Sequence, residues 1–451
     1  MITMLDERER QLIGSMEQTG RKFWLFIGFL SSIVLLGVAA FIHQLRTGLG
    51  VTGMRDYISW GVYITNFVFF IGISHAGTLI SAILRVAGSR WKASITRIAE
   101  AITVIALMIG APMVIIDMGH PERVLNVFLY GRLQSPILWD VLCVTTYLTG
   151  SILYLYVPMI PDLAILRDHW EKTGGWRHKL YKKLSLGWRG TENQKRLLER
   201  GIAIMAVLII PIAASVHTVV SWIFGMTLRP GWHSTIFGPY FVVGAIFSGI
   251  ASLMIAMVVF RKAFHLERYI TQVQFKRLGY LFLVLNLLYI YFTFSEYLTA
   301  GYGHIEIENR LLDVLFRGQY AVHFWFMVVV GLIIPAFILA IPRTATVGGF
   351  FAASILVNFG MWLKRYVIVV PTMAVPFLPM QRLTEEFARY RPTWVEWSIT
   401  AAAFAGFILL YTLFAKIFPI VSIWETREEA KMQRALEKAS QGELILAEDF
   451  R

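Results

Sequence analysis

Ten long apolar runs constrain this chain more than any other feature. Each has about the length of the roughly 20-residue helix that crosses the ~30 Å hydrocarbon core of a bilayer. The sequence therefore predicts an all-α polytopic membrane protein with ten transmembrane helices, at 23–43, 57–84, 98–117, 137–160, 202–225, 237–260, 278–297, 320–341, 346–370 and 398–419.

The composition excludes an ordinary soluble protein. Hydrophobic residues make up 57% of the chain and charged residues 16%, with a mean hydropathy of +0.60, whereas soluble proteins carry about 25% charged residues. The single cysteine, Cys143, lies inside an apolar run. One thiol builds neither a disulfide framework nor an iron–sulfur or thiolate metal site. We therefore expect no metal, haem or iron–sulfur cluster in this chain.

The basic residues are distributed unevenly along the chain. An even number of spanning helices places both termini on one side, and most of the 42 lysines and arginines lie in the tails and connections on that side. The positive-inside rule assigns it to the cytoplasm. The net charge of +13 follows from this asymmetry, so we expect the bilayer and its anionic lipids as the partner, and no nucleic acid.

Internal repetition relates predicted helices 2–5 to helices 6–9. Helices 2 and 6 both carry closely spaced small residues, in ISHAGTLISAILRVAG and VVGAIFSGIASLMIA, a pattern that favours close helix packing. Asp117 ends helix 3 much as Glu296 ends helix 7, and His217 follows Gly201 at the spacing at which Arg365 follows Gly349. We predict two related four-helix bundles, with helices 1 and 10 outside them.

Four regions follow from this pattern. A connection rich in basic residues and glycine, 161–201, predicts a cytoplasmic arm with short surface helices, and the Pro- and aromatic-rich segment 371–397 is expected to face an extracytoplasmic partner. The predicted regions are 1–56, the N-terminal tail and first helix; 57–225, the first bundle with its arm; 237–370, the second bundle; and 371–451, the outer loop, last helix and cytoplasmic tail.

The polar stretch DMGHPERVLNVFLYGRLQSPILWD, at 117–140, separates two apolar runs. Asp117 and Asp140 close it at membrane-embedded helix ends, where a charge is costly unless it has a function or a partner. His120 and Arg123 supply basic groups inside the stretch. The pattern indicates a built site at the membrane surface.

Two motifs in this stretch resemble a known family. DMGHPERVLN at 117–126 and QSPILWD at 134–140 are similar to the paired D-x-G-x-P-x-R and S-P-x-x-W patterns of the NrfD/PsrC family. ISHAGTLISAILRV in helix 2 and NFGMWLKRYVIV in helix 9 also fit, so the resemblance covers about 57–370. Within the family the chain is most similar to the ActC branch, from alternative complex III, although His120 stands where relatives often carry another basic residue.

The resemblance implies a function. Members are quinone-interacting membrane subunits of molybdopterin and iron–sulfur oxidoreductases, and the ActC branch oxidises quinol. It implies a respiratory or photosynthetic electron-transfer complex in the bacterial inner membrane that uses quinone or quinol, with menaquinone expected. The implied partners are an iron–sulfur subunit on the extracytoplasmic face, c-type haem subunits and a second NrfD-like membrane subunit. The chain contains neither CxxC nor CxxCH, so we expect it to be inactive alone.

A quinol site needs groups that hydrogen-bond two ring oxygens and take up two protons. Histidines and buried carboxylates can accept protons near neutral pH, and on the predicted topology several lie in the outer half of the membrane. The predicted catalytic residues are Asp117, His75 and Asp140, and the predicted quinol-binding residues are Tyr63, Asn66, His120, Arg123 and His217.

Structural explanations for these residues stay open. Asp117 and Asp140 could pair with Arg123 and Arg132, a common use of membrane acids. Either intramembrane histidine could simply hydrogen-bond a neighbouring helix.

The second bundle is expected to support proton movement or structure and not to hold the quinol. Its candidates for a proton path are Glu296, His323 and Arg365, with Glu100 at the inner end of helix 3. Arginine adds a fixed positive charge that could keep Glu296 ionised.

Two other function classes are weighed against quinol chemistry. A b-type haem anchor needs paired histidines on facing helices, which His75 and His217 could supply only once. A secondary transporter usually shows inverted repeats and broken helices at mid-membrane, whereas the repeat here has four helices of parallel sense.

Overall fold

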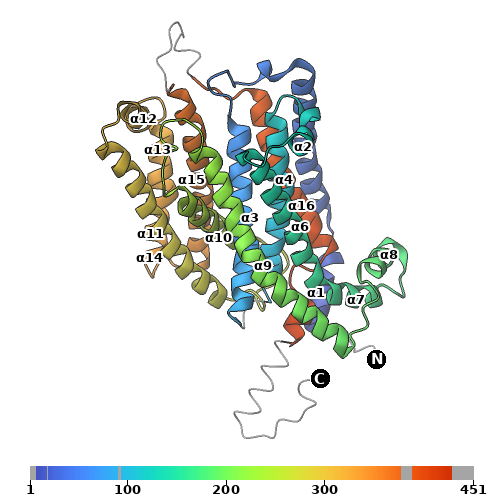
Figure 1. The fold of residues 1–451 in the computed structure, drawn as a ribbon. Coiled ribbons are helices and arrows are strands. Elements are labelled where there is room, and N and C mark those ends of the chain that lie inside the picture. The colour runs from blue at the N-terminus through green and yellow to red at the C-terminus, as the bar shows by residue number, and fades with distance from the viewer. Residues whose placement is uncertain (1–6, 18, 90–92, 377–388, 429–451) are drawn as a thin grey trace.

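A computed structural model describes residues 7–17, 19–89, 93–376 and 389–428 (Figure 1). Within these ranges the protein is helical and has no strand, and it has ten helices long and apolar enough to cross a membrane. The predicted fold class is confirmed. The middle of the expected outer segment, 377–388, and the tail from 429 lie outside the described residues.

The membrane-crossing helices follow the predicted order (Figure 1). Their bounds are α2 (Arg21–Thr47), α3 (Val62–Val86), α4 (Thr96–Asp117), α6 (Pro136–Tyr156), α9 (Glu192–Gly225), α10 (Phe237–Ala263), α11 (Gln272–Tyr302), α13 (Ala321–Val328) with α14 (Ile334–Ala340), α15 (Val347–Ala374) and α16 (Trp394–Ile417).

Two closed rings of helices form the core. In the first ring α3, α4, α6 and α9 each pack against the next, and in the second α10, α11, α13–α14 and α15 do the same. The rings meet where α3 packs against α10, with α9 also touching α10 and α15 touching α3. Helices α2 and α16 pair outside the first ring. This is the predicted arrangement of two four-helix bundles with two flanking helices.

Small residues permit the closest helix contact in the first ring. A Cβ at Gly77 of α3 would collide with the backbone of Ala99 on α4, and a Cβ at Gly110 of α4 would lie 2.9 Å from Cβ of Phe70. Replacing either glycine would push the two helices apart, so the small-residue pattern noted in the sequence sets their separation.

Short helices close the two ends of the rings. Helix α1 (Glu7–Glu17) packs against α16, and α7 (Ile160–His169) packs against α8 (Gly175–Leu184) at the same end. We call this the inner end, following the predicted orientation. The opposite, outer end carries α5 (Asn126–Leu129) and α12 (Glu306–Phe316). The expected short helices of the 161–201 arm are thus present.

Helix α9 extends into the predicted arm. Helix α9 begins at Glu192, well before the predicted start at 202, so the last part of the arm is the first turns of a spanning helix. Thr191 caps it: its side chain accepts a hydrogen bond from the backbone N–H of Gln194 at 3.4 Å. The capping box at this polar start allows the helix to extend beyond the apolar run.

The eighth predicted span, 320–341, is interrupted by a short π-helix at Val329–Ile333. Pro335 has no N–H to give to the preceding turn. The side-chain amide of Asn286 on α11 donates to the carbonyl of Leu332 at 3.2 Å, which satisfies one group in the irregular turn. Gly331 lies very close to Gly360 of α15: a Cβ on Gly331 would be 2.6 Å from the Cα of Gly360.

Candidate functional site

Asp117 is the last residue of α4, at the outer end of the first ring. Its Oδ1 is buried and has no hydrogen-bond partner in the part of the chain that the structure describes. Tyr63 and Glu396 lie close enough to interact with it electrostatically. Arg123 is exposed and forms no described ion pair with it, so the structural explanation by ion pairing is not observed.

Asp140 lies one turn into α6, which Pro136 begins. The side chain is buried, and its Oδ1 also lacks a partner among the residues described. Arg132, its expected counter-ion, is exposed and makes no described ion pair. Helices α4 and α6 pack together, so two carboxylates with an unsatisfied buried oxygen border the 118–135 loop.

Glu396, also at the outer end, is a buried carboxylate whose two oxygens both accept hydrogen bonds. It is fully buried, and its Oε2 accepts from the backbone N–H groups of Gly53 at 2.6 Å and Thr393 at 2.8 Å. Tyr390 donates its hydroxyl to Oε1 and in turn accepts from the N–H of Val62 at 2.9 Å. Glu396 therefore fixes the outer loops in place, whereas Asp117 beside it keeps an oxygen available.

His75 lies fully buried at the middle of α3. Its Nδ1 is 2.9 Å from the carbonyl of Ile71, and its Nε2 is 2.5 Å from the carbonyl of Ala213 on α9. A neutral imidazole has one N–H and can donate to only one of these carbonyls; the imidazolium could donate to both. The alternative that this histidine bonds a neighbouring helix is therefore observed, and its catalytic role stays a prediction.

His217 lies beside His75, with the two ring centroids 3.9 Å apart. That separation leaves no room for a porphyrin and its iron between the rings. The pair therefore does not have the geometry that a b-type haem anchor requires. Tyr147 of α6 completes this buried group, with its ring centroid 4.9 Å from that of His75.

Tyr63 and Asn66, the other candidates on α3, connect it to its neighbours. The Tyr63 hydroxyl donates to Oε1 of Gln44 on α2 at 2.7 Å. Asn66 donates to the hydroxyl of Thr400 on α16 at 2.9 Å and accepts from the indole N–H of Trp362 on α15 at 2.8 Å. Gln44 in turn donates to the carbonyl of Ile116, next to Asp117, at 2.9 Å, so these two residues join α2 to the first ring near Asp117. The contacts of Asn66 explain it without a ligand.

His120 lies on the outer surface with Arg123, apart from the buried groups. Its ring Nδ1 is 2.8 Å from Oε1 of Glu122, and both side chains are well exposed. Hydrogen bonds from its own backbone N–H and from His120 hold the pKa of Glu122 below its ordinary value. These residues are placed to contact a partner or an entering ligand, not to line a buried slot.

In the second ring the cation that lies against Glu296 is not Arg365, which the sequence analysis considered for that role. Lys364, the preceding residue on α15, is fully buried and lies with its Nζ 3.4 Å from Oε2 of Glu296. It also donates to the hydroxyl of Tyr297 at 3.0 Å. Successive residues on a helix point about 100° apart, so Lys364 faces α11 while Arg365 faces the junction between the rings.

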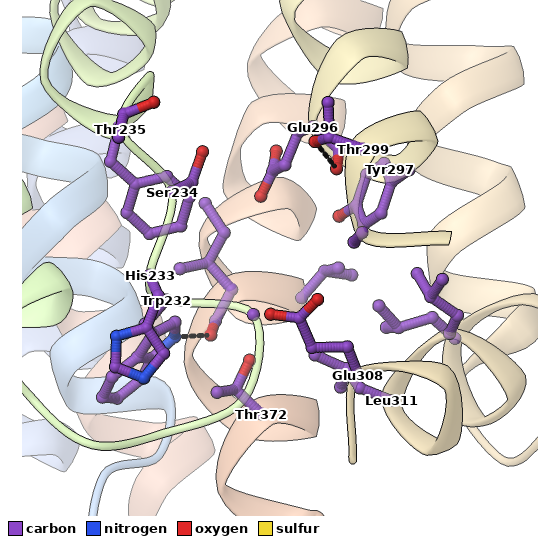
Figure 2. Close-up of a pocket in the computed structure, with 17 residues that line it drawn as sticks. Trp232, His233, Ser234, Thr235, Glu296, Tyr297, Thr299, Glu308, Leu311 and Thr372 are labelled. Atoms are coloured by element: carbon purple, nitrogen blue, oxygen red, sulfur yellow. Dashed lines mark hydrogen bonds between the residues drawn. The ribbon is translucent and has the colours of Figure 1, made fainter. Parts of the chain in front are cut away.

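A pocket of about 300 Å³ lies beside Glu296, and Figure 2 shows its lining. The carboxylates of Glu296 and Glu308 point into it from α11 and α12 (Figure 2). The apolar walls come from Trp232 of the 226–236 loop, from α12 and from α15. The outer end of the second ring is therefore open at Glu296.

His323 and Glu100 lie at opposite ends of the molecule. His323 is half-buried near the outer end, stacked on Tyr366 at 5.4 Å between ring centroids. Glu100 is buried at the inner end, where it accepts from Ser81 at 2.6 Å and pairs with Arg85 at 3.3 Å. No described contact joins these residues to the Lys364–Glu296 pair.

The sequence analysis did not identify several groups that hold the helices together. The inner end is closed by ion pairs of Arg97 with Asp162 and of Arg85 with Glu425, the latter 2.9 Å apart. Two other such residues, Lys364 and Glu396, could have been identified from the sequence. Lys364 is a lysine inside a predicted span, where charges normally have a partner or a function, and Glu396 follows Thr393 in the spacing of a capping box.

The described ranges contain no group of three or more histidine, cysteine or acidic side chains placed to hold a metal ion.

Comparison with known proteins gives a consistent picture. The family model described as polysulphide reductase, NrfD, matches residues 50–376, more than half of the chain. A membrane subunit of a putative dimethyl sulfoxide reductase from Halobacterium salinarum is 28% identical over 78% of this chain and 77% of its own length. A selenate reductase subunit from Mesobacillus selenatarsenatis is 24% identical over 88% and 94% of the two chains. The integral membrane subunit of a menaquinone reductase from Nitratidesulfovibrio vulgaris is 24% identical over 88% and 92%.

Proposed function

Because this chain belongs to the polysulphide reductase NrfD family, we propose that it exchanges electrons with quinone as the membrane subunit of a multi-subunit oxidoreductase. The relatives are named as subunits of reductases, and one is named for menaquinone. We propose menaquinol as the substrate, and oxidation as the direction.

The observation that carries this proposal is the pair of unsatisfied acids at the outer end of the first ring. Asp117 and Asp140 each have a buried carboxylate oxygen without a partner among the described residues. A quinol has two hydroxyl groups, which can donate to such oxygens. The acids then hold the two protons released when the quinol loses two electrons. We propose that the quinol site lies in the first bundle, 57–225.

The electrons need an acceptor in another subunit. The chain has one cysteine, which cannot hold an iron–sulfur cluster by itself, and we propose that the oxidant is a redox centre of a partner. We propose an iron–sulfur subunit on the extracytoplasmic face, with c-type haem subunits and a second NrfD-like membrane subunit, as in the ActC branch. Both termini are then cytoplasmic, in the bacterial inner membrane.

Asp117→Asn tests the site. Asparagine keeps the shape of the side chain but cannot accept a proton, so quinol oxidation by the purified complex should fall by about 100-fold or more. Asp313→Asn is the matched control, because Asp313 is exposed on α12. Full activity of the Asp117 variant would show that the acid is a spectator. Failure of that variant alone to assemble would show a structural role.

The side of the membrane is tested separately, by labelling. A cysteine introduced at Leu133, which is 78% exposed in the outer loop, should react in intact cells with a reagent that does not cross the inner membrane. A cysteine at Trp176 on α8, 59% exposed at the inner end, should react only after the cells are opened. The reverse pattern would invert the topology and with it the proposed partner face.

Proton movement through the second ring is a second candidate function, and one observation favours it. A run of buried polar side chains leads from the junction to the pocket: Arg365 donates to Tyr289 at 3.4 Å, Tyr289 packs on Tyr240, Lys364 lies 4.9 Å from the ring centroid of Tyr240, and Glu296 is its ion-pair partner. We propose that Glu296 exchanges protons with water in the pocket. Proton release by a Glu296→Gln complex in liposomes tests this role.

A further inference from the structure

Arg365 is a permanent positive charge buried where the two rings meet. Its side chain is 2% exposed, and a guanidinium stays protonated in proteins. Its described hydrogen bond goes to the neutral hydroxyl of Tyr289, and its Nε has no partner in the described ranges. Glu296, an acid on the adjoining helix α11, is paired with Lys364. A buried charge without a counter-charge is strongly unfavourable.

His217 presents a second unsatisfied group at the same place. It is fully buried, and neither ring nitrogen has a hydrogen-bond partner among the residues described. An imidazole always carries at least one N–H, so His217 offers a donor to this junction in any tautomer.

The two side chains converge on one point beside Gly72 of α3. A Cβ at this glycine would lie 3.6 Å from Nη2 of Arg365, 3.7 Å from Oγ of Ser248 and 3.9 Å from Nε2 of His217. These atoms come from α15, α10 and α9, so four spanning helices from both rings face the same small space. Gly244 on α10 also lies against the guanidinium, at 3.2 Å from its own Cβ position to Nη2.

We propose that Arg365, His217 and Ser248 bind a small inorganic anion, of the size of chloride, beside Gly72. Arginine offers only donors and the imidazole offers an N–H; the serine hydroxyl, which donates to the carbonyl of Gly244 at 2.9 Å in this structure, can rotate towards an anion. A monovalent anion supplies the missing charge, whereas water would leave the guanidinium unbalanced.

The bound anion links the two rings. His217 and Arg365 occupy corresponding places in the repeat, on the fifth and ninth spanning helices, and the anion lies between them at the contact of α3 with α10. It is therefore a structural ligand of the ring junction. This inference does not depend on the quinol site, which lies at the outer end of the first ring.

Bromide identifies the ligand directly. The complex, purified with its partner subunits and crystallised in bromide in place of chloride, should show an anomalous scattering peak beside Gly72, within contact distance of Arg365 and His217. Density at that point without bromide signal, in crystals that show bromide elsewhere, would mean that water fills the site and would overturn the proposal.

Thermal unfolding provides an independent test. The complex in chloride should unfold several degrees higher than in gluconate, an anion too large for the site. Arg365→Gln should lose this dependence on chloride, while the control Arg343→Gln, at an exposed position, should keep it. An Arg365 variant that retains the full chloride effect, or a wild-type complex without one, contradicts an anion at this junction.

Discussion

The outer ends of the two rings carry acids at corresponding places in the repeat, but the side chains around these acids differ. Asp117 of the first ring keeps a buried oxygen without a partner among the described residues. Glu296 of the second ring lies against the ammonium group of Lys364 and lines an open pocket. The charge of Glu296 is balanced by a neighbouring cation, whereas a buried carboxyl group without a partner must be neutral or bind a donor. The same repeat thus contains one paired acid and one acid with an unoccupied acceptor.

The difference arises from α15 and its counterpart α9. On α15, Lys364 and Arg365 place two positive charges in the second ring, one facing Glu296 and the other facing the junction. On α9 the matching region carries His217 and no lysine. The two rings therefore differ more in the basic residues near their acids than in the acids themselves.

Removing the lysine should have the largest effect on the folded state. Lys364→Met leaves Glu296 as a buried charge without its partner, which typically costs about 3–5 kcal/mol. We expect about 3 kcal/mol of destabilisation, at the lower end of this range, since the pocket gives Glu296 some access to water. The measurement is the free energy of unfolding, or the unfolding midpoint, of the purified complex.

The control for Lys364→Met is the double variant Lys364→Met with Glu296→Gln. It removes both charges together, so most of the lost stability should return. If the double variant is as unstable as the single one, Lys364 acts through packing, and the contrast between the two rings loses its electrostatic basis.

The second prediction compares catalysis in the two rings. Glu296→Gln should leave quinol oxidation within a few-fold of the unmodified complex, against the loss of about 100-fold expected for Asp117→Asn. Proton release to the outside of liposomes should fall in Glu296→Gln if protons pass through the second ring. Loss of quinol binding in Glu296→Gln, with activity retained in Asp117→Asn, would exchange the roles of the two bundles.

The fold could be predicted largely from the sequence because its signal is local. Ten runs of apolar residues specify ten spanning helices, and the repeat specifies how they group. Interruptions were harder: the π-helix at Val329–Ile333 depends on Asn286 and on Gly360, which lie on other helices. The hydropathy of one apolar run does not reveal its contacts with other helices.

The site was predicted in its residue types but not in its pairings. Asp117 and Asp140 follow from the cost of acids in membranes, and that argument needs no partner. Arg365 was considered as the charge that could keep Glu296 ionised, whereas Lys364 lies against it. Adjacent residues on a helix face different neighbours, and the sequence does not say which neighbour each one faces. His120 and Asn66 were grouped with buried groups, although one is exposed and the other is satisfied by α15 and α16.

The smallest effect is expected at the surface of the first ring. His120→Ala removes an exposed contact with Glu122, and exposed ion pairs contribute only about 0–1 kcal/mol, so the unfolding midpoint of the complex should hardly change. Quinol oxidation with a small soluble acceptor should also stay within about two-fold, the scale of such a surface contact. If His120 instead contacts the partner subunit, electron transfer to that partner should slow while the reaction with the small acceptor does not. A large loss with both acceptors would place His120 at the quinol, and the division between a buried acid pair and an exposed docking loop would then fail.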